Sequence, residues 1–298
     1  MKQAFAKNKT NPFIIILGIA QDGGVPHCGC NNLCCRKAWG DLSVRKNTTS
    51  LAIIDPQLKK RWLIETTPDF KFQLALLNKV FPTIKKPPGL EGIFLTHGHI
   101  GHYTGLLCLE KAILNAQKIP VFVMPKMKIF LLANSPWKDL IQKKNIKIKQ
   151  LQKNQKTKLN KHISILPFLV NHRDEYTETV GFVIEGPNKK VLFIPDIDKW
   201  EFLKNDIKEM VRKVDLAFLD GTFFDQSELS YRNIKEIPHP LISESIKIFS
   251  KLPLLERRKI YFIHFNHTNP VLNKKSKAYK QVIKTGFQIT EEGTVFAI

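Results

Sequence analysis

The most informative stretch of the chain reads Ile93-Phe94-Leu95-Thr96-His97-Gly98-His99-Ile100-Gly101-His102-Tyr103-Thr104-Gly105. Its apolar start is typical of a strand, and three histidines then stand close together before a helical pattern begins. Neutral imidazole is a common ligand of zinc and iron, and a turn at the end of a strand can direct several side chains to one point. The stretch therefore predicts a metal site, with His97 and His99 on one ion and His102 turned toward another. A polar loop with ordinary histidines is the alternative, which the clustering of three of the chain's 9 histidines disfavours.

Four more side chains that can bind metal stand where other apolar runs end. They are His172, Asp196, Asp220 and His264. Each of them alone would fit a cap, a turn or a buried core histidine. Their repeated position at the end of an apolar run is what a site built along one edge of a sheet would produce. We therefore expect these residues to join the three clustered histidines.

Short apolar runs bounded by Gly, Pro, Asn and charged residues recur along the chain and predict strands. They lie at 13–17, 51–54, 62–64, 93–95, 121–123, 163–166, 180–184, 191–194, 216–219 and 260–263. Helical patterns lie at 69–78, 104–114, 127–133, 241–249 and 276–283. This order favours an α+β fold in αββα layers over strict βαβ alternation. Because no repeat or linker stands out, residues 1–298 are predicted to form one domain with a basic tail at 1–11.

The composition excludes a disordered, collagenous or coiled-coil chain. Hydrophobic residues make up 43% of the 298 residues, which is enough for a core of ordinary size. The 47 Lys and Arg residues against 26 Asp and Glu give a net charge of +21, which suggests either a polyanionic partner or a lysine-biased genome. The densest lysine run, at 143–161, lacks Arg and aromatic residues, so it predicts a solvated loop or edge strand rather than a nucleic-acid stripe.

The sequence favours a cytoplasmic location and no contact with a membrane. No segment approaches the roughly 18 apolar residues of a membrane span, and no small-residue cleavage pattern follows the apolar run at 13–20. A secretory signal is the alternative, because Lys2, Lys7 and Lys9 precede that run. Four of the 5 cysteines lie between positions 28 and 35, which suits a metal better than disulfides among themselves.

The Thr-His-x-His-x-x-His turn, followed by a lone His, a strand-ending Asp and a C-terminal His, resembles the metallo-β-lactamase superfamily over nearly the whole chain. Within that superfamily the sequence is similar to the pyrroloquinoline-quinone biosynthesis protein B family and to the cyclic-phosphate phosphodiesterases of phosphonate metabolism. The resemblance rests on Leu17-Gly18, on Gly23-Gly24-Val25-Pro26 with the cysteines that follow, on residues 99–106, on Asp220-Gly221-Thr222 and on residues 263–270. It implies a four-layer αββα sandwich.

The resemblance also implies two metal positions in the active site. Their ligands would be His97, His99 and His172 for the first metal, His102 and His264 for the second, and Asp196 as the bridge. One departure concerns the second metal, because the superfamily has Asp immediately before the last His of the motif and this chain has Gly101. The expectation is one metal or a weakly occupied second site, unless another carboxylate such as Asp220 supplies a ligand. The biosynthesis protein B family often lacks part of the first histidine set, which this chain retains.

A structural zinc site is implied for the cysteine-rich segment at 26–36. The related families place cysteines four, six and nine residues after Pro26, and the phosphodiesterases add a C-terminal histidine. Here Cys30 and Cys35 match, and Cys34 is the expected substitute for the cysteine missing at position 32, with Cys28 as the alternative. His267 is the expected fourth ligand. Three cysteines and one histidine form a closed tetrahedral zinc site, which is structural rather than catalytic. Redox use of Cys34 and Cys35 is the alternative.

Asp220 and His239 are expected to take part in catalysis, and Arg173 in binding the substrate. In superfamily phosphodiesterases a carboxylate orients a later histidine that acts as general acid, and Asp220 and His239 are similar in order and spacing. The alternative makes His239 only a helix N-terminal residue. Arg173, directly after His172, is expected to pair with a phosphate or carboxylate of the substrate. Its alternative role is in a surface salt-bridge cluster with Asp174 and Glu175.

These features together predict a metal-dependent hydrolase that acts on a small anionic phosphodiester or ester through metal-bound hydroxide. One or two ions of Zn²⁺, Mn²⁺ or Fe²⁺ would fill its active site. An iron-dependent oxygenase or oxidase of quinone cofactor biosynthesis is the first alternative. A phosphodiesterase of tRNA or other nucleic acid, motivated by the +21 charge, and a non-catalytic zinc-binding protein are the others.

Overall fold

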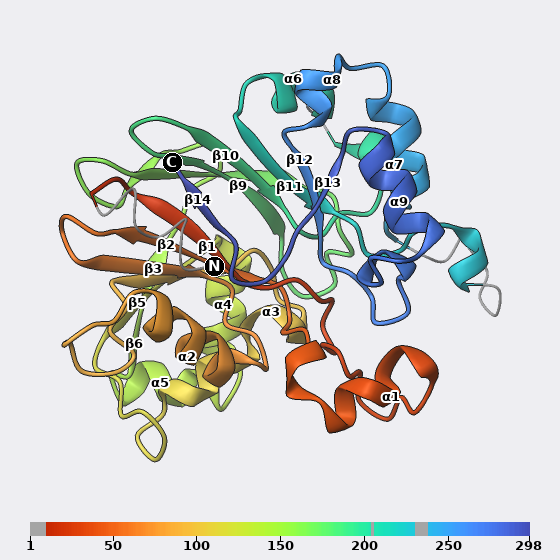
Figure 1. Ribbon diagram of the computed structural model, residues 1–298. Helices are drawn as coiled ribbons and strands as arrows, with labels where there is room; N and C mark the ends of the chain where they lie inside the picture. The colour runs from red at the N-terminus through yellow and green to blue at the C-terminus, as the bar shows by residue number, and fades with distance from the viewer. Residues whose placement is uncertain (1–9, 204–205, 230–237) are drawn as a thin grey trace.

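The computed structural model describes residues 10–203, 206–229 and 238–298 (Figure 1). Within these residues the chain forms two seven-stranded sheets with helices on their outer sides. The predicted basic tail at 1–11 falls outside this part of the chain, apart from its last two residues. No described helix is long and apolar enough to cross a membrane. That the whole chain forms one domain stays a prediction.

The first sheet contains β1 (Phe13–Gly18), β2 (Ser50–Asp55), β3 (Lys60–Ile64), β4 (Gly92–Phe94), β5 (Ile119–Val123), β6 (Ile146–Gln150) and β14 (Val295–Ala297). The second contains β7 (Thr157–Lys158), β8 (Ser164–Val170), β9 (Thr179–Glu185), β10 (Lys190–Ile194), β11 (Leu216–Asp220), β12 (Ile260–Ile263) and β13 (Gln288–Ile289). The strand order is β14-β1-β2-β3-β4-β5-β6 in the first sheet and β13-β12-β11-β10-β9-β8-β7 in the second.

The described α-helices are α1 (Leu33–Gly40), α2 (Phe70–Val80), α3 (Ile100–Tyr103), α4 (Pro125–Ala133), α5 (Trp137–Gln142), α6 (Ile207–Arg212), α7 (Ile242–Phe249), α8 (Leu254–Arg257) and α9 (Lys277–Lys284). Apolar residues of α2, α4 and α5 pack on the first sheet, whereas those of α6, α7 and α9 join the core that includes the second sheet. Figure 1 shows these two groups of helices on opposite sides of the paired sheets.

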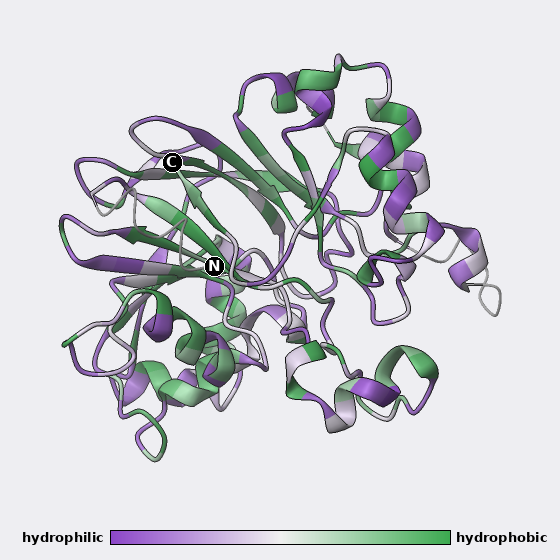
Figure 2. Ribbon diagram, in the orientation of Figure 1, coloured by the Kyte–Doolittle hydropathy of each residue, from purple (hydrophilic) through white to green (hydrophobic). Residues whose placement is uncertain are grey.

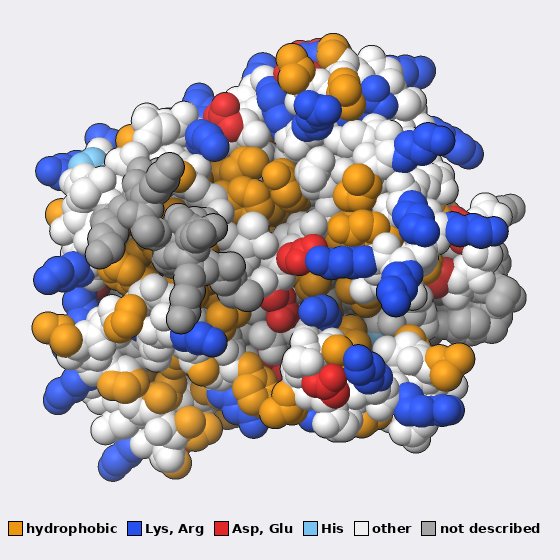
Figure 3. Space-filling model, in the orientation of Figure 1, with side chains coloured by type: hydrophobic (Ala, Val, Ile, Leu, Met, Phe, Trp, Pro, Cys, Tyr) orange, Lys and Arg blue, Asp and Glu red, His pale blue; other side chains and the backbone are white. Residues whose placement is uncertain are grey.

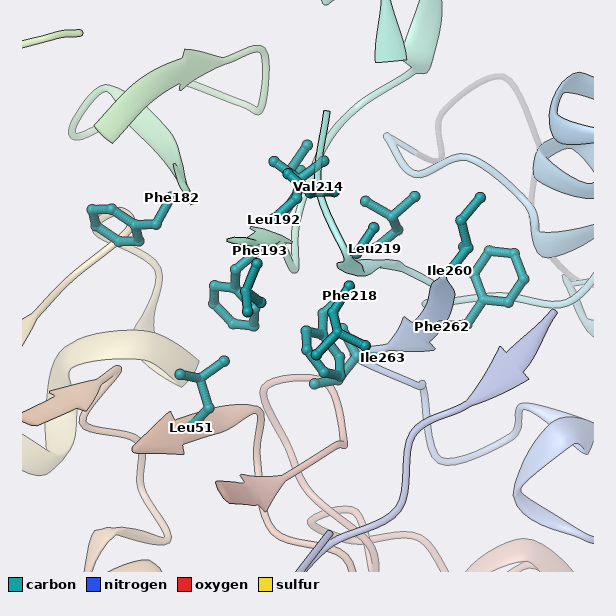
Figure 4. Close-up of a cluster of buried hydrophobic side chains, with 14 of the residues drawn as sticks. Leu51, Phe182, Leu192, Phe193, Val214, Phe218, Leu219, Ile260, Phe262 and Ile263 are labelled. Atoms are coloured by element: carbon teal, nitrogen blue, oxygen red, sulfur yellow. The ribbon is translucent and has the colours of Figure 1, made fainter. Parts of the chain in front are cut away.

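The central strands are buried on both faces, which explains why they appear in the sequence as unbroken apolar runs. In β1 the side chains of Ile14 and Ile16 belong to the core between the sheets, and that of Ile15 belongs to the core under α2, α4 and α5. Figure 4 shows Phe193 and Phe218 of the second sheet pointing toward the first sheet. Figure 2 shows hydrophobic residues concentrated on the strands. The chain therefore has the predicted αββα sandwich.

All ten predicted strands form, but one predicted helix does not. Where an α-helix was expected at 104–114, the chain forms a 3₁₀-helix over Thr104–Leu109 followed by turns. The N–H of Glu110 donates to the carbonyl of Leu107, three residues earlier, which is the bond of a 3₁₀-helix rather than the i to i−4 bond of an α-helix. The helices α1, α5, α6 and α8, of 8, 6, 6 and 4 residues, were not predicted.

The lysine-rich run at 143–161 contains edge strands of both sheets. Strand β6 ends the first sheet and β7 ends the second. In β6 Lys147 and Lys149 are exposed, whereas Ile146 is buried. Lysine on an edge strand discourages pairing with another chain. The positions of β6 and β7 at the ends of the sheets agree with the predicted edge strand. On the face shown in Figure 3, Lys and Arg side chains are spread over the surface rather than gathered in one stripe.

Parallel pairing brings the site residues to one edge of the fold. Strands β10, β11 and β12 are parallel neighbours in the second sheet, and β3 and β4 are parallel neighbours in the first. The carboxyl ends of parallel strands lie at the same edge of a sheet, where loops can place functional side chains. The residues that follow these ends are Glu65, His97, Asp196 and His264, and Asp220 is the last residue of β11.

Candidate metal centre

The structure brings together all six residues predicted as active-site ligands. They are His97, His99, His102, His172, Asp196 and His264. Five are buried, and the His99 side chain, at the start of α3, is 11% exposed. The sequence separates the first and last of them by 167 positions (264 − 97), so the two sheets provide their proximity.

His97, His99, His172 and Asp196 form a first group whose ligand atoms lie within 4.8 Å of one another. Nδ1 of His99 is 2.9 Å from Nε2 of His97 and 3.2 Å from Nε2 of His172. Oδ2 of Asp196 is 3.4 Å from Nε2 of His97 and 3.2 Å from Nε2 of His172. A tetrahedron around zinc with bonds of about 2.0–2.1 Å has edges of about 3.3 Å. The four atoms therefore fit a tetrahedral metal site.

A second group lies on the other side of Asp196. It contains Asp22, His102 and His264, whose ligand atoms also lie within 4.8 Å of one another. Oδ2 of Asp196 is 3.7 Å from Nε2 of His102 and 3.9 Å from Nε2 of His264. One carboxylate oxygen thus faces both groups, as a bridging ligand would. Asp22 was not predicted, because it lies outside the histidine motif and after a different strand.

Each of the five imidazoles has an outer partner for the ring nitrogen that faces away from the centre. The pairs are His97 with Thr96 (2.8 Å), His99 with Glu175 (3.1 Å), His172 with Asp198 (3.0 Å), His264 with Thr222 (2.9 Å) and, at ion-pair distance, His102 with Glu65 (3.6 Å). Such partners fix the ring orientation and tautomer of metal-binding histidines. Their presence at all five rings is typical of a metal centre.

The Thr222 hydroxyl determines the tautomer of His264. It lies 2.7 Å from Oδ1 of Asp220, to which it donates its only proton. Its oxygen, 2.9 Å from Nδ1 of His264, must then accept the proton of that nitrogen. The lone pair of His264 therefore sits on Nε2, which is the nitrogen that faces Asp22 and Asp196.

Several buried polar atoms at the centre have no hydrogen-bond partner among the described residues. They include Oδ1 of Asp22, Oδ1 of Asp196, both ring nitrogens of His102 and Nε2 of His264. An unsatisfied buried polar group costs about 1–3 kcal/mol, so each such group in a folded protein calls for an explanation. A divalent cation would be coordinated by the atoms that converge here. The residues present thus fit a divalent metal.

The electrostatics of the centre agree with its chemistry. Burial alone would raise the pKa of Asp196, but His172, His264 and His239 outweigh it and hold that pKa well below its usual range. Burial and the neighbouring His102 lower the pKa of His97, which favours the neutral ring that binds metals. Burial also opposes protonation of His172, but Asp196 and Asp198 raise its pKa to about 10. A metal would have to displace that proton.

The structure also brings together the predicted catalytic pair. Nδ1 of His239 lies 3.0 Å from Oδ2 of Asp220 and 3.2 Å from Oδ1 of Asp196. His239 is buried and precedes α7, which begins at Ile242 with Leu241 as its N-cap. The contacts of His239 with Asp220 and Asp196 disfavour the alternative of a residue that only precedes a helix. The acid role of His239 stays a prediction.

Arg173 and its neighbours lie at the outer side of the centre. Arg173 is exposed, and burial together with the charges of His172 and Arg173 lowers the pKa of His99. Glu175 accepts from Nε2 of His99, so this carboxylate belongs to the centre rather than to a surface cluster. Binding of a substrate by Arg173 stays a prediction.

The four residues predicted for a structural zinc, Cys30, Cys34, Cys35 and His267, also converge, and their ligand atoms lie within 4.8 Å of one another. The sulfurs of Cys30 and Cys34 are 3.7 Å apart, close to the edge of about 3.8 Å that follows from zinc–sulfur bonds of about 2.3 Å. All five cysteines are free thiols, and burial raises the pKa of Cys35 to about 12. A reactive thiol needs a lowered pKa, so the redox alternative is disfavoured.

His27 is a further residue of the cysteine cluster that was not predicted. Its backbone N–H donates to Sγ of Cys35 at 3.3 Å, and its ring lies 4.3 Å from the ring of His267. Sequence spacing alone gives no signal for this stacking, because the two histidines are 240 positions apart (267 − 27).

Comparisons with known proteins agree with this geometry. A family model described as "Beta-lactamase superfamily domain" matches residues 60–265. Coenzyme PQQ synthesis protein B of Methylorubrum extorquens strain PA1 is 24% identical over 301 residues, which cover 94% of this chain and 98% of that protein. The match therefore spans nearly the full length of both proteins.

Two solved structures share the fold. Zinc-bound PqqB from Methylobacterium extorquens aligns with a TM-score of 0.80 at 22% identity, over 96% of this chain and 100% of its own. A diphosphatase of the PhnP family aligns with a TM-score of 0.68 at 24% identity, over 96% of this chain and 98% of its own. With the family model matched over most of the chain, this protein belongs to the β-lactamase superfamily, as its histidine motif predicted.

Proposed function

We propose that the protein is a metal-dependent hydrolase that cleaves a phosphodiester or ester bond of a small anionic molecule. The observation that carries the proposal is the position of the Asp220–His239 pair directly beside the first group of ligand atoms, with Nδ1 of His239 3.2 Å from the bridging carboxylate of Asp196. A divalent cation bound there, Zn²⁺, Mn²⁺ or Fe²⁺, would polarise the attacked P=O or C=O group and lower the pKa of water to about 7.

The chain's own residues supply the proton for the leaving group. Burial would lower the pKa of His239, but the carboxylates of Asp220 and Asp196 outweigh it and raise that pKa. A raised pKa favours the protonated ring, which is the form that a general acid requires. Asp220 accepts the hydrogen bond from Nδ1 and fixes the ring, so Nε2 is the nitrogen that can release a proton to a leaving oxygen.

Positive charge beside the centre supports an anionic substrate. Arg173 is exposed and directly follows His172 in the sequence. An arginine can bind a phosphate or carboxylate through two parallel hydrogen bonds. The net charge of +21 would raise the encounter rate with any anion.

The cysteine cluster supports a second role for metal. We propose that Cys30, Cys34, Cys35 and His267 hold a structural zinc ion that joins the segment around α1 to the loop after β12. Thiols persist in a reducing compartment, in line with the proposed cytoplasmic location.

Hydrolysis can be tested with bis(p-nitrophenyl) phosphate and the full chain loaded with Zn²⁺, Mn²⁺ or Fe²⁺. We expect turnover that a chelator abolishes. On a diester with a poor alkoxide leaving group, which needs a proton, His239→Ala should lose about 100- to 10,000-fold in kcat with unchanged metal content, whereas the loss with the weakly basic p-nitrophenolate should be much smaller. His99→Ala should abolish activity with the fold intact. Lack of turnover with every metal, or turnover without metal, would contradict the proposal.

An iron-dependent oxygenase or oxidase is the second candidate. It is favoured by the similarity to coenzyme PQQ synthesis protein B over 94% of this chain. Imidazole and carboxylate ligands suit Fe²⁺ as well as Zn²⁺. Oxygen uptake by the iron-loaded protein, measured without any phosphodiester present, would favour this candidate over hydrolysis.

A further inference from the structure

The second group of ligand atoms poses a question about its carboxylate. The superfamily motif places an aspartate immediately before its last histidine, where this chain has Gly101. A metal position with two imidazoles and only a shared bridging carboxylate would have no carboxylate ligand of its own. The space beside Gly101 therefore decides whether the second position is complete.

That space is filled by Asp22. A Cβ added to Gly101 would lie 2.2 Å from Oδ1 and 2.6 Å from Cγ of Asp22, and 2.7 Å from its Cα. A Cβ atom in a folded protein essentially never has a contact shorter than 3.0 Å. A side chain at position 101 and the observed position of Asp22 thus exclude each other. Glycine at 101 is the condition for a carboxylate that enters from the loop after β1.

Backbone hydrogen bonds hold the Asp22 loop against the residue that follows His264. The N–H of Gln21 donates to the carbonyl of Phe265 at 2.8 Å, and Ala20 forms a parallel bridge with Phe265. The N–H of Gly24 closes the turn on the carbonyl of Gln21, also at 2.8 Å. The position of Asp22 is therefore fixed relative to His264.

The atoms of Asp22 are aimed at the second group. Its Oδ1 lies 3.3 Å from Nε2 of His102 and 3.8 Å from Nε2 of His264. This oxygen is buried and has no hydrogen-bond partner among the described residues, and the two facing nitrogens likewise have none. Three unsatisfied ligand atoms thus face one another across a space of the size that a divalent ion needs.

Asp220, the carboxylate that the sequence suggested for this position, is already engaged. Its Oδ1 accepts from the N–H and the hydroxyl of Thr222, and its Oδ2 accepts from the N–H of Ile197 and from Nδ1 of His239. A metal would have to replace these bonds. Asp220 is therefore suited to orient its neighbours rather than to supply the missing ligand.

We propose that Asp22 replaces the absent motif aspartate as the carboxylate ligand of a second divalent metal, and that Gly101 is the compensating change that makes room for it. The chain then holds a complete two-metal centre, with Asp22, His102 and His264 on the second ion and Asp196 as the bridge. This inference rests on the proposed metal centre, but its test reads metal content and not turnover.

The test measures zinc per chain by plasma mass spectrometry after the purified full chain has been loaded with Zn²⁺ and desalted. We expect three ions in the wild type, two at the centre and one at the cysteine cluster. Asp22→Asn keeps the shape of the side chain and removes its charge, so we expect two ions. Asp206→Asn, at the exposed N-cap of α6 and outside both centres, is the matched control, in which we expect three ions.

A second variant tests the role of the space. Gly101→Ala should displace Asp22 and reduce the content to two ions, whereas Gly40→Ala, where an added Cβ meets nothing within 4 Å, should keep three. Circular dichroism and the retained cysteine-bound zinc show that each variant is folded.

The outcomes separate this inference from the proposed function. Three ions in Asp22→Asn, or two in the wild type that fall to one in Cys30→Ala, would overturn the role of Asp22 and leave a mononuclear hydrolase. A single ion in the wild type, lost on replacement of Cys30, would overturn both.

Discussion

His264 and Glu65 show how the chain positions single residues at the centre. Their φ angles of 68° and 70° lie in the left-handed region, which costs a residue other than glycine of order 1–3 kcal/mol. Both residues directly follow a strand, β12 and β3 respectively. The turn that each makes brings Nε2 of His264 toward Asp22 and Oε2 of Glu65 to 3.6 Å from Nδ1 of His102. Such strain at a site is retained where it serves function.

Thr222→Val tests the residue that sets the tautomer of His264. Valine keeps the shape but removes the hydroxyl that contacts both Asp220 and His264. Loss of an outer partner of a metal ligand weakens metal affinity by about 10- to 100-fold. A chelator competition assay measures this change, and Thr222→Ser, which keeps the hydroxyl, is the control. Equal affinities of the valine and serine variants would show that the hydroxyl has no such role.

Glu292 provides a pH-dependent prediction away from the metal centre. Burial raises the pKa of Glu292 from its ordinary 4.5 to about 7, although the N–H of Asn47 donates to it and lowers that pKa. The folded state therefore prefers the protonated carboxyl, and ionisation destabilises it as the pH rises from 4.5 through about 7. Glu292→Gln should have wild-type stability near pH 4 and exceed it by at most about 3 kcal/mol near pH 8. Urea unfolding at both values measures the difference, and an equal difference at both would contradict the prediction.

At the scale of elements, the strands buried on both faces were predicted from sequence because an unbroken apolar run is their direct consequence. Strands β7 and β13, with 2 residues each, and the lysine-rich edge strand β6 lack this signal. The segment after His102 has a helical pattern, yet it forms a 3₁₀-helix over Thr104–Leu109 followed by turns. Periodicity alone does not separate a short 3₁₀-helix from an α-helix.

The cysteine cluster joins two elements, and its removal should therefore reduce stability first. Cys30→Ala takes one ligand from the group that connects the segment around α1 with the loop after β12. A structural zinc contributes its binding free energy to folding. We expect a lower thermal midpoint for Cys30→Ala, with metal still bound at the active site. Cys28→Ser, outside the cluster and exposed, is the control. Equal midpoints for the two variants would contradict a structural zinc.

At the scale of the whole molecule, the fold brings together residues from both sheets that the sequence keeps apart. The six predicted ligands and the Asp220–His239 pair could be placed from sequence, because a known motif and a repeated strand-end position indicated them. Asp22 could not, since it lies 79 positions before Gly101 (101 − 22) and only the packing of the loop after β1 against α3 relates the two.

The net charge of +21 is also a property of the whole molecule. Because the densest lysine run, at 143–161, lacks Arg and aromatic residues, we expect weak, sequence-independent binding of tRNA. Such binding should fall steeply between about 50 and 200 mM salt, as counterion release requires. Fluorescence anisotropy measures it. Binding that stays tight at high salt would instead favour a nucleic-acid substrate.

Anomalous X-ray diffraction at the zinc edge, from crystals of the zinc-loaded protein, tests the metal centre most directly. We expect one peak about 2.0–2.2 Å from Nε2 of His97, Nδ1 of His99, Nε2 of His172 and Oδ2 of Asp196. A second peak should lie at bonding distance from Asp22, His102 and His264, and a third among the cysteines. A peak at the cysteine cluster alone, with none at the ends of β4, β8, β10 and β12, would contradict the metal centre.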